Sequence, residues 1–268
     1  MLGILGIVAA FAVLIGGALC DGDPLSSLVS STATIIVFGG TFAALLTQFG
    51  FGHIMVAGKG LKWVVAPPKA DMPAFVEAIG GWANIARSQG TLALEGELNN
   101  VKDEFQKKGL QLIIDNTPVA EMLPIMGALS ENAGRDEKIP GEVWEAAGGY
   151  LPTIGVMGAV LGLIHVMMRL DHPEELGEGV ATAFVATIYG VGAANLIFLP
   201  LGTRLSGVAE VLERERNIII QGFLLLAEGK PGISIRQSLQ SLLPKAHGKP
   251  KPAAGADGEP AGAVGEAA

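Results

Sequence analysis

The sequence predicts an all-α integral membrane protein with four transmembrane helices in two hairpins and a helical cytoplasmic domain. Half of the 268 residues are hydrophobic and 16% are charged, whereas soluble domains have about 25% charged residues. Asp, Glu, Lys and Arg are absent from four long stretches: 2–20, 24–58, 146–168 and 179–203. A helix needs roughly 20 apolar residues to cross a hydrocarbon core of about 30 Å, so each stretch is long enough to span a membrane.

The first hairpin is expected at 1–56, with spans at 2–20 and 33–51. A cleaved signal peptide ending near Cys20 is the alternative for the first span. That alternative is disfavoured because no Lys or Arg precedes the apolar run, whereas a signal peptide begins with positive charge.

The second hairpin is expected at 146–203, with spans at 148–168 and 179–201. Small residues recur on one face of each span, as is typical of helices that pack closely in lipid. They are Gly155, Gly158 and Gly162 on the third span, and Ala183, Thr187, Gly190 and Ala194 on the fourth.

The distribution of positive charge predicts the orientation. Segments 52–147 and 204–268 hold nine and eight of the 18 Lys and Arg residues, while loops 21–32 and 170–178 hold none. Positive residues favour the cytoplasmic side. We therefore expect a multi-pass protein of a bacterial inner membrane with both termini in the cytoplasm.

Segment 57–145 is expected to form the cytoplasmic helical domain. Asp71 is a helix cap, with Pro73 in the first turn, and an apolar face follows at helical spacing. The members of that face are Phe75, Ile79 and Trp82. A second helix is expected through Leu94, Leu98, Val101 and Phe105, with a stop at Gly109. A third is expected over 110–132, interrupted near Pro118 and Pro124.

Segment 204–243 is expected to form C-terminal cytoplasmic helices, at about 206–228 and 234–243. The charges of the first helix predict a solvated face; they are Glu210, Glu213, Arg214, Glu215 and Arg216. Residues 244–268 are rich in Pro, Ala and Gly, which predicts a disordered tail.

Composition excludes several classes of function. A net charge of −8 argues against nucleic-acid binding, and a single cysteine forms no internal disulfide. The four histidines show no metal-ligand spacing, and the spans carry no nucleophile or acid–base set, so neither an enzyme nor a cofactor is expected. The spans also lack carboxylates. Ion pathways use buried acids, so a partner chain would have to supply one.

Three residues of the second hairpin have both a structural and a functional interpretation. The hydroxyl of Thr187 either bonds to its own helix backbone or faces a narrow polar pathway. Pro152 and Pro200 lie near the cytoplasmic ends of their spans and remove helix hydrogen bonds. Each proline is either a packing irregularity or a hinge that links the membrane to the cytoplasm.

Several motifs resemble one known family in order along the chain. The stretch AGGYLPTIGVMGAVLGLIH at 147–165 resembles the third span of the MotA/PomA family of flagellar stator proteins, within the MotA/TolQ/ExbB proton channel superfamily. The segments LDHPEELG at 170–177, ATAFVATIYG at 181–190 and ANLIFLP at 194–200 are similar to the loop and fourth span. The resemblance extends over about 1–243.

This resemblance implies an A-type stator subunit. Five A-type chains would surround two B-type chains, and the B-type chain would carry a membrane aspartate. Ion flow past that aspartate would generate torque on the rotor switch protein. Thr187 and Ala159 match ion-pathway positions, and Pro152 and Pro200 match the family's functional prolines.

Two further features come from the resemblance. Arg87 and Glu95 have the spacing of the family's rotor-contacting charges, although solvation also explains an exposed Arg and Glu. Ala159 occupies a position at which the sodium-driven members of the family have Thr. Alanine offers no oxygen to a dehydrated Na⁺, so a proton is favoured as the ion.

Two alternatives remain open. An ExbB/TolQ-type energy-transducing subunit would have three spans and an outer N-terminus. A passive membrane scaffold would tolerate replacement of Arg87, Glu95 and Thr187.

Overall fold

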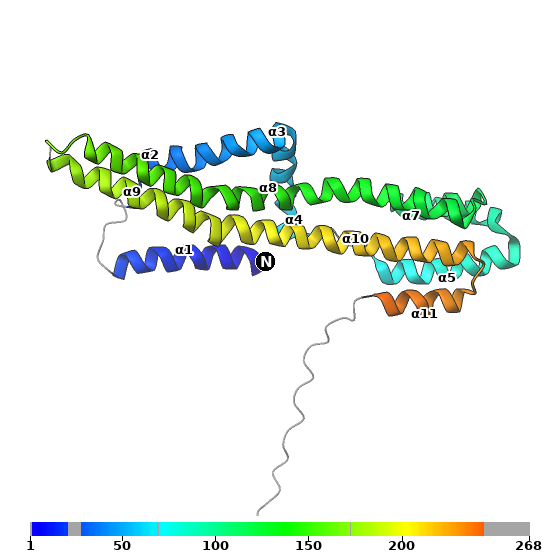
Figure 1. Cartoon of the computed structure of the whole chain (residues 1–268). Coiled ribbons are helices and arrows are strands. Elements are labelled where there is room, and N and C mark those ends of the chain that lie inside the picture. The colour runs from blue at the N-terminus through cyan, green and yellow to red at the C-terminus, as the bar shows by residue number, and fades with distance from the viewer. Residues whose placement is uncertain (1, 21–27, 69, 172, 244–268) are drawn as a thin grey trace, which may run out of the picture.

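The computed structural model describes residues 2–20, 28–68, 70–171 and 173–243, and this part of the chain forms helices and turns without a strand. The molecule is a long rod of roughly parallel and antiparallel helices (Figure 1). The elements in order are α1 (Leu2–Cys20), α2 (Ser31–Thr34), η2 (Ile35–Gly39), α3 (Gly40–Gly60), α4 (Lys62–Val65), α5 (Met72–Gln89), η3 (Thr91–Leu94), α6 (Glu95–Leu98), α7 (Glu104–Ile114), α8 (Val119–Met167), α9 (Pro173–Ala193), η4 (Ala194–Phe198), α10 (Leu199–Ala227) and α11 (Gly232–Leu242).

Among the described residues, three helical runs are long and apolar enough to cross a membrane: Ser31–Val65, Val119–Met167 and Gly179–Ala227. They contain the predicted second, third and fourth spans. The predicted first span coincides with α1, a helix of 19 residues, and its role as a fourth span stays a prediction. The predicted tail at 244–268 lies outside the described residues.

The third and fourth predicted spans continue without interruption into the charged half of the molecule. α8 runs for 49 residues and includes Pro124, Pro140 and Pro152. α9, η4 and α10 form the antiparallel run beside it (Figure 1). The expected interruption near Pro124 is therefore wrong, and Pro118 is the N-cap of α8. Pro124 is the sixth residue of α8, so it removes the hydrogen bond to the Ala120 carbonyl oxygen without ending the helix.

Glycines bring α8 and α9 into backbone contact, as their spacing predicts. A Cβ atom on Gly155 would lie 2.9 Å from the Ala186 carbonyl oxygen, and one on Gly190 would lie 2.6 Å from the Leu151 carbonyl oxygen. A Cβ on Gly162 would meet Ala183 at 3.1 Å. We call this contact the glycine seam.

α3 changes direction at Gly50, whose φ of 72° is strained for residues with a side chain. The second half of α3 crosses α8, and α4 reaches α10 (Figure 1). A Cβ on Gly60 would lie 2.6 Å from Pro140, so these two residues fix the crossing point.

The charged end of the rod has its own apolar core, built from α5, η3, α7, the start of α8, α10 and α11. The predicted cap is confirmed: the Asp71 carboxylate accepts a hydrogen bond from the Ala74 N–H, 3.1 Å away. The predicted apolar face is also buried, and the Trp82 ring stacks on Phe223 with centroids 6.1 Å apart.

The single helix expected from Leu94 to Phe105 is wrong. The chain forms η3 and α6 there, and α7 starts after Asp103, whose carboxylate accepts from the Gln106 N–H. Gly109 lies inside α7 rather than ending it. A side chain at Gly109 would overlap the Phe223 ring, so this glycine serves helix packing.

Candidate functional site

Thr187 and Ala159 flank the glycine seam at the same level. Each follows a seam residue, and those two residues, Ala186 and Gly158, face each other: a Cβ on Gly158 would lie 3.1 Å from the Ala186 Cβ. Both Thr187 and Ala159 are half-buried. The Thr187 hydroxyl donates to the Ala183 carbonyl at 3.3 Å, which is long for an O–H···O bond. The hydroxyl is therefore only weakly engaged by its own helix.

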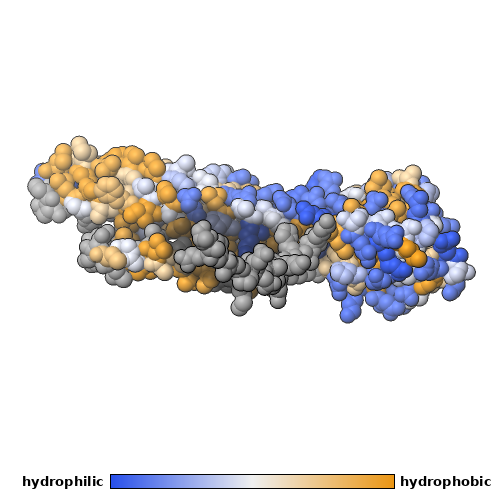
Figure 2. Space-filling model, turned by 90° about the horizontal axis from the view of Figure 1, so that it is seen from below, coloured by the Kyte–Doolittle hydropathy of each residue, from blue (hydrophilic) through white to orange (hydrophobic). Residues whose placement is uncertain are grey.

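The outer faces of this helix pair are apolar and uncovered in the single chain. Val156 is 54% exposed on α8 and Phe184 is 67% exposed on α9. Figure 2 shows hydrophobic residues over this end of the rod and hydrophilic residues over the other end. Surfaces of this kind are covered by lipid or by partner helices.

Pro152 and Pro200 each follow a residue that contacts the facing long helix. Leu151, which precedes Pro152, lies with its carbonyl against Gly190, while Leu199, which precedes Pro200, packs on Gly148. Pro152 is half-buried inside α8, and Pro200 is exposed in the first turn of α10. The π-helical turn η4 comes directly before that turn. Because proline has no N–H, the wider turn accommodates the missing hydrogen bond.

Arg87 and Glu95 are both exposed at the charged end of the rod. Arg87 lies in the last turn of α5, and Glu95 is the first residue of α6. Gly90, with a φ of 88°, redirects the chain between them. Arg87 also lines a cleft of about 160 Å³ that Lys230 enters from the end of α10. A cation at a helix C-terminus is stabilised by the helix dipole, which gives Arg87 a structural role as well.

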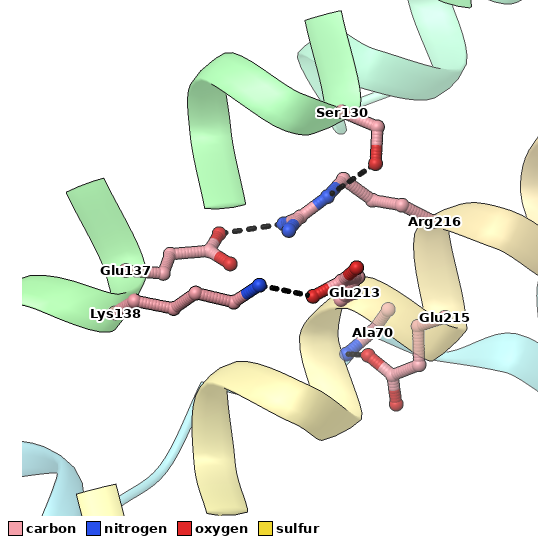
Figure 3. A network of polar contacts seen from close by, with 7 residues as sticks. All are labelled: Ala70, Ser130, Glu137, Lys138, Glu213, Glu215 and Arg216. Atoms are coloured by element: carbon pink, nitrogen blue, oxygen red, sulfur yellow. Dashed lines mark hydrogen bonds and ion pairs between the residues drawn. The ribbon is translucent and has the colours of Figure 1, made fainter. Parts of the chain in front are cut away.

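A polar network that the sequence did not predict joins α8 to α10 (Figure 3). The Arg216 guanidinium donates through Nε to the Ser130 hydroxyl at 3.2 Å and through Nη1 to Glu137 Oε1 at 2.6 Å. Nearby, Lys138 Nζ lies 2.8 Å from Glu213 Oε2. We call these residues, with Glu215, the α8–α10 network.

The expectation of a fully solvated face on 206–228 is wrong for Arg216, which is 8% exposed. One sequence signal could have revealed this: Arg216 lies midway between Ala209 and Phe223, at seven-residue spacing, and both of these residues are buried. Arg216 therefore belongs to the inward stripe of α10.

The pKa values of two carboxylates of the network, Glu215 and Glu213, shift in opposite directions. Burial raises the pKa of Glu215, and the hydrogen bond from the Ala70 N–H and the charge of Arg216 partly offset that effect. The hydrogen bond and charge of Lys138 lower the pKa of Glu213. In return, the hydrogen bond and charge of Glu213 raise the pKa of Lys138.

Known proteins are similar in sequence to most of this chain. The model of the MotA/TolQ/ExbB proton channel family matches residues 97–218. Motility protein A of Helicobacter pylori is 32% identical over 249 residues, which cover 92% of this chain and 96% of that protein. Motility protein A of Bacillus subtilis is 30% identical, with 90% of each chain covered. Chemotaxis protein PomA of Vibrio alginolyticus is 30% identical over 85% of this chain and 88% of that protein.

Two solved structures of MotAB stators are also similar to this chain over most of its length. The structure of C. jejuni MotAB matches with a TM-score of 0.82 at 28% identity, over 92% of this chain and 96% of that chain. The flagellar MotAB stator complex from Bacillus subtilis matches with a TM-score of 0.80 at 29% identity, over 91% of this chain and 97% of that chain.

Proposed function

We propose that this chain, which belongs to the MotA/TolQ/ExbB proton channel family and is a MotA-type flagellar stator subunit rather than an enzyme, joins a B-type subunit in an ion channel that drives the rotor. The resemblance to MotAB complexes over nearly the whole chain supports this assembly. Five copies surround two B-type chains in the proposed complex.

The conducted ion is a proton in this proposal. The spans of this chain hold no carboxylate, so the membrane aspartate comes from the B-type partner. Thr187 and Ala159 face that aspartate from either side of the glycine seam. Alanine in place of a hydroxyl residue favours a proton over Na⁺. Each charge that crosses gains about 2.3 kcal/mol per 100 mV.

Four transmembrane helices place both termini in the cytoplasm of the proposed assembly. α1 serves as the first span beside the three long apolar runs. The excess of Lys and Arg in 52–147 and 204–268 supports this orientation in the inner membrane. The charged end of the rod then projects toward the rotor.

The single observation that carries the coupling mechanism is the continuity of α8 and of the α9–α10 run. These helices connect the glycine seam to the charged end without a flexible linker. Pro152 and Pro200 allow the helices to bend where they leave the membrane. Arg87 and Glu95 meet charges of the rotor switch protein and supply mainly orientation rather than affinity.

The experiment uses cells that lack this gene and every other stator gene. The wild-type gene, Thr187→Ala or Arg87→Glu is returned, and swimming speed and flagellar assembly are scored. The wild-type gene is expected to restore swimming, while both variants leave flagella assembled but slow or paralysed. Lys102→Gln, an exposed charge outside the proposed sites, is the matched control for surface charge.

Either of two outcomes would overturn the proposal. Swimming that persists in the deleted strain excludes a role in the motor and favours an ExbB/TolQ-type transducer. Full rescue by both variants excludes the named residues and favours a passive scaffold.

A further inference from the structure

An apolar groove of about 250 Å³ lies in the angle between α3 and α8. The turn at Gly50 creates it, because it directs the second half of α3 across α8. Its walls include Phe42 and Leu45 from the first half, Gly58 from the second half, and Trp144 and Phe198 from the long helices. In the proposed topology, the groove lies where the spans meet the cytoplasm.

The polar groups in the walls already have partners. The Thr41 hydroxyl donates to the Val37 carbonyl at 2.7 Å. The Trp144 indole N–H donates to the Ala57 carbonyl at 3.2 Å. The groove therefore presents carbon to its occupant, and water gains little by entering it. A dry apolar cavity of about 150 Å³ holds one benzene molecule, so this groove has room for a longer stretch of hydrocarbon.

Positive charge lies just outside the groove. Lys59 follows the groove residue Gly58. Lys62 lies four residues, about one helical turn, beyond Gly58 and therefore on the same face of the helix. The backbone at Leu61 is helical, so this helix face continues from α3 into α4. Both lysines are exposed. An apolar groove with cations at its mouth matches the two parts of an anionic phospholipid.

We propose that the groove binds an anionic phospholipid of the cytoplasmic leaflet, with an acyl chain against Trp144 and the phosphate at Lys59 and Lys62. The size of the groove favours a chain over a helix, because a helix with its side chains is about 10 Å wide. The cytoplasmic leaflet has a negative surface, which attracts lysines close to the end of a span. The inference rests on the proposed orientation of the chain.

The test uses the full complex with its B-type partner, reconstituted in vesicles of brominated phosphatidylglycerol or brominated phosphatidylcholine. Bromine atoms in the acyl chains quench Trp144 on contact, and the signal is the quenching that Trp144→Phe removes. We expect stronger quenching by phosphatidylglycerol. Lys59→Gln/Lys62→Gln should reduce this preference by about fivefold per lysine, while Lys102→Gln/Lys107→Gln should leave it unchanged.

A second pair of variants tests the groove itself. A Cβ on Gly58 meets no atom within 4 Å, so Gly58→Leu should fill the groove and abolish the Trp144 quenching. Gly52 is equally open, belongs to the same helical segment and is not part of the groove lining, so Gly52→Leu should keep the quenching.

Equal quenching by the two lipids, or quenching that survives Gly58→Leu, would overturn the proposal. Absence of Trp144 quenching in the wild-type complex would instead assign the groove to a neighbouring subunit. The measurement needs no rotor, so its failure is distinct from a failure of the motility experiment.

Discussion

The two long helical runs are joined differently in the apolar half and in the charged half of the molecule. In the apolar half, Gly155 and Gly190 leave no room for a side chain between the backbones. In the charged half, Arg216 reaches across to Ser130 and Glu137 (Figure 3). Lipid provides no hydrophobic drive between helices, so close backbone packing must hold them. In water an apolar core supplies that drive, and polar pairs can fix which residues meet.

The largest expected effect comes from widening the seam. Gly190→Leu should prevent α8 and α9 from packing, since even a Cβ would lie 2.6 Å from the Leu151 carbonyl oxygen. Overpacking of a tight contact costs about 1–3 kcal/mol and occasionally more. Leucine adds four carbon atoms where even the first does not fit, so we expect a loss above that range and above the loss expected in the charged half. The measurement is the yield and thermal midpoint of the purified complex. Gly149→Leu, where a Cβ meets no atom within 4 Å, is the control, and equal losses would show that the seam is not special.

A smaller effect is expected in the charged half. Arg216→Met leaves the Glu137 carboxylate without its main partner, and breaking a buried pair costs about 3–5 kcal/mol when neither group reaches water. Glu137 is 20% exposed, so the loss should fall below that range. Arg216→Met/Glu137→Leu should recover most of the stability, because apolar replacement of a buried pair is nearly neutral.

Thermal unfolding of the complex measures both Arg216 variants. A double variant as unstable as the single one would show that the guanidinium itself, rather than its pairing, stabilises the helix contact.

The smallest effects have opposite signs at the two neighbouring glutamates. Glu215 has a raised pKa, so its carboxyl favours folding when protonated, and that contribution is lost as the pH rises through the raised value. Glu215→Gln should therefore raise the unfolding midpoint at pH 7, and the gain should vanish as the pH falls toward 4.5, the ordinary pKa of a glutamate side chain.

Glu213 has a lowered pKa, so its contribution is present at neutral pH and disappears as the pH falls through the lowered value. Glu213→Gln should lower the midpoint slightly at pH 7, and less at high salt. Midpoints measured across pH for both variants provide the check. Shifts of the same sign at pH 7 would contradict the opposite tuning of these groups.

Local patterns predicted much of this architecture. The cap at Asp71, the three long apolar runs and the glycine seam follow from residues close together in sequence. The continuity of α8 through Pro124 and of α7 through Gly109 did not follow, because it depends on what packs against the helix. Phe223, which fills the space at Gly109, is more than a hundred residues away.

In the candidate site, too, some features follow from local sequence and others depend on packing between distant residues. Sequence placed Arg87 and Glu95 at the surface, and the structure agrees on these positions. Sequence counted Thr187 among the small residues of the helix contact, whereas in the structure Ala186 makes that contact and Thr187 lies half-buried next to it. Sequence did not reveal that Lys230 shares a cleft with Arg87, or that Arg216 is buried. These juxtapositions arise from tertiary packing between helices distant in the chain.

The unbroken length of α8 has a mechanical consequence. At 1.5 Å per residue, the helix extends roughly 50 Å from Pro152 to its start at Val119. If Pro152 is the proposed hinge, α8 can therefore act as a lever arm with its pivot at the proposed membrane surface. A tilt of about 10° at the pivot would sweep the far end through roughly 9 Å, comparable to the width of a helix. A short stroke beside the proposed ion pathway would thus become a step on the scale of a protein surface.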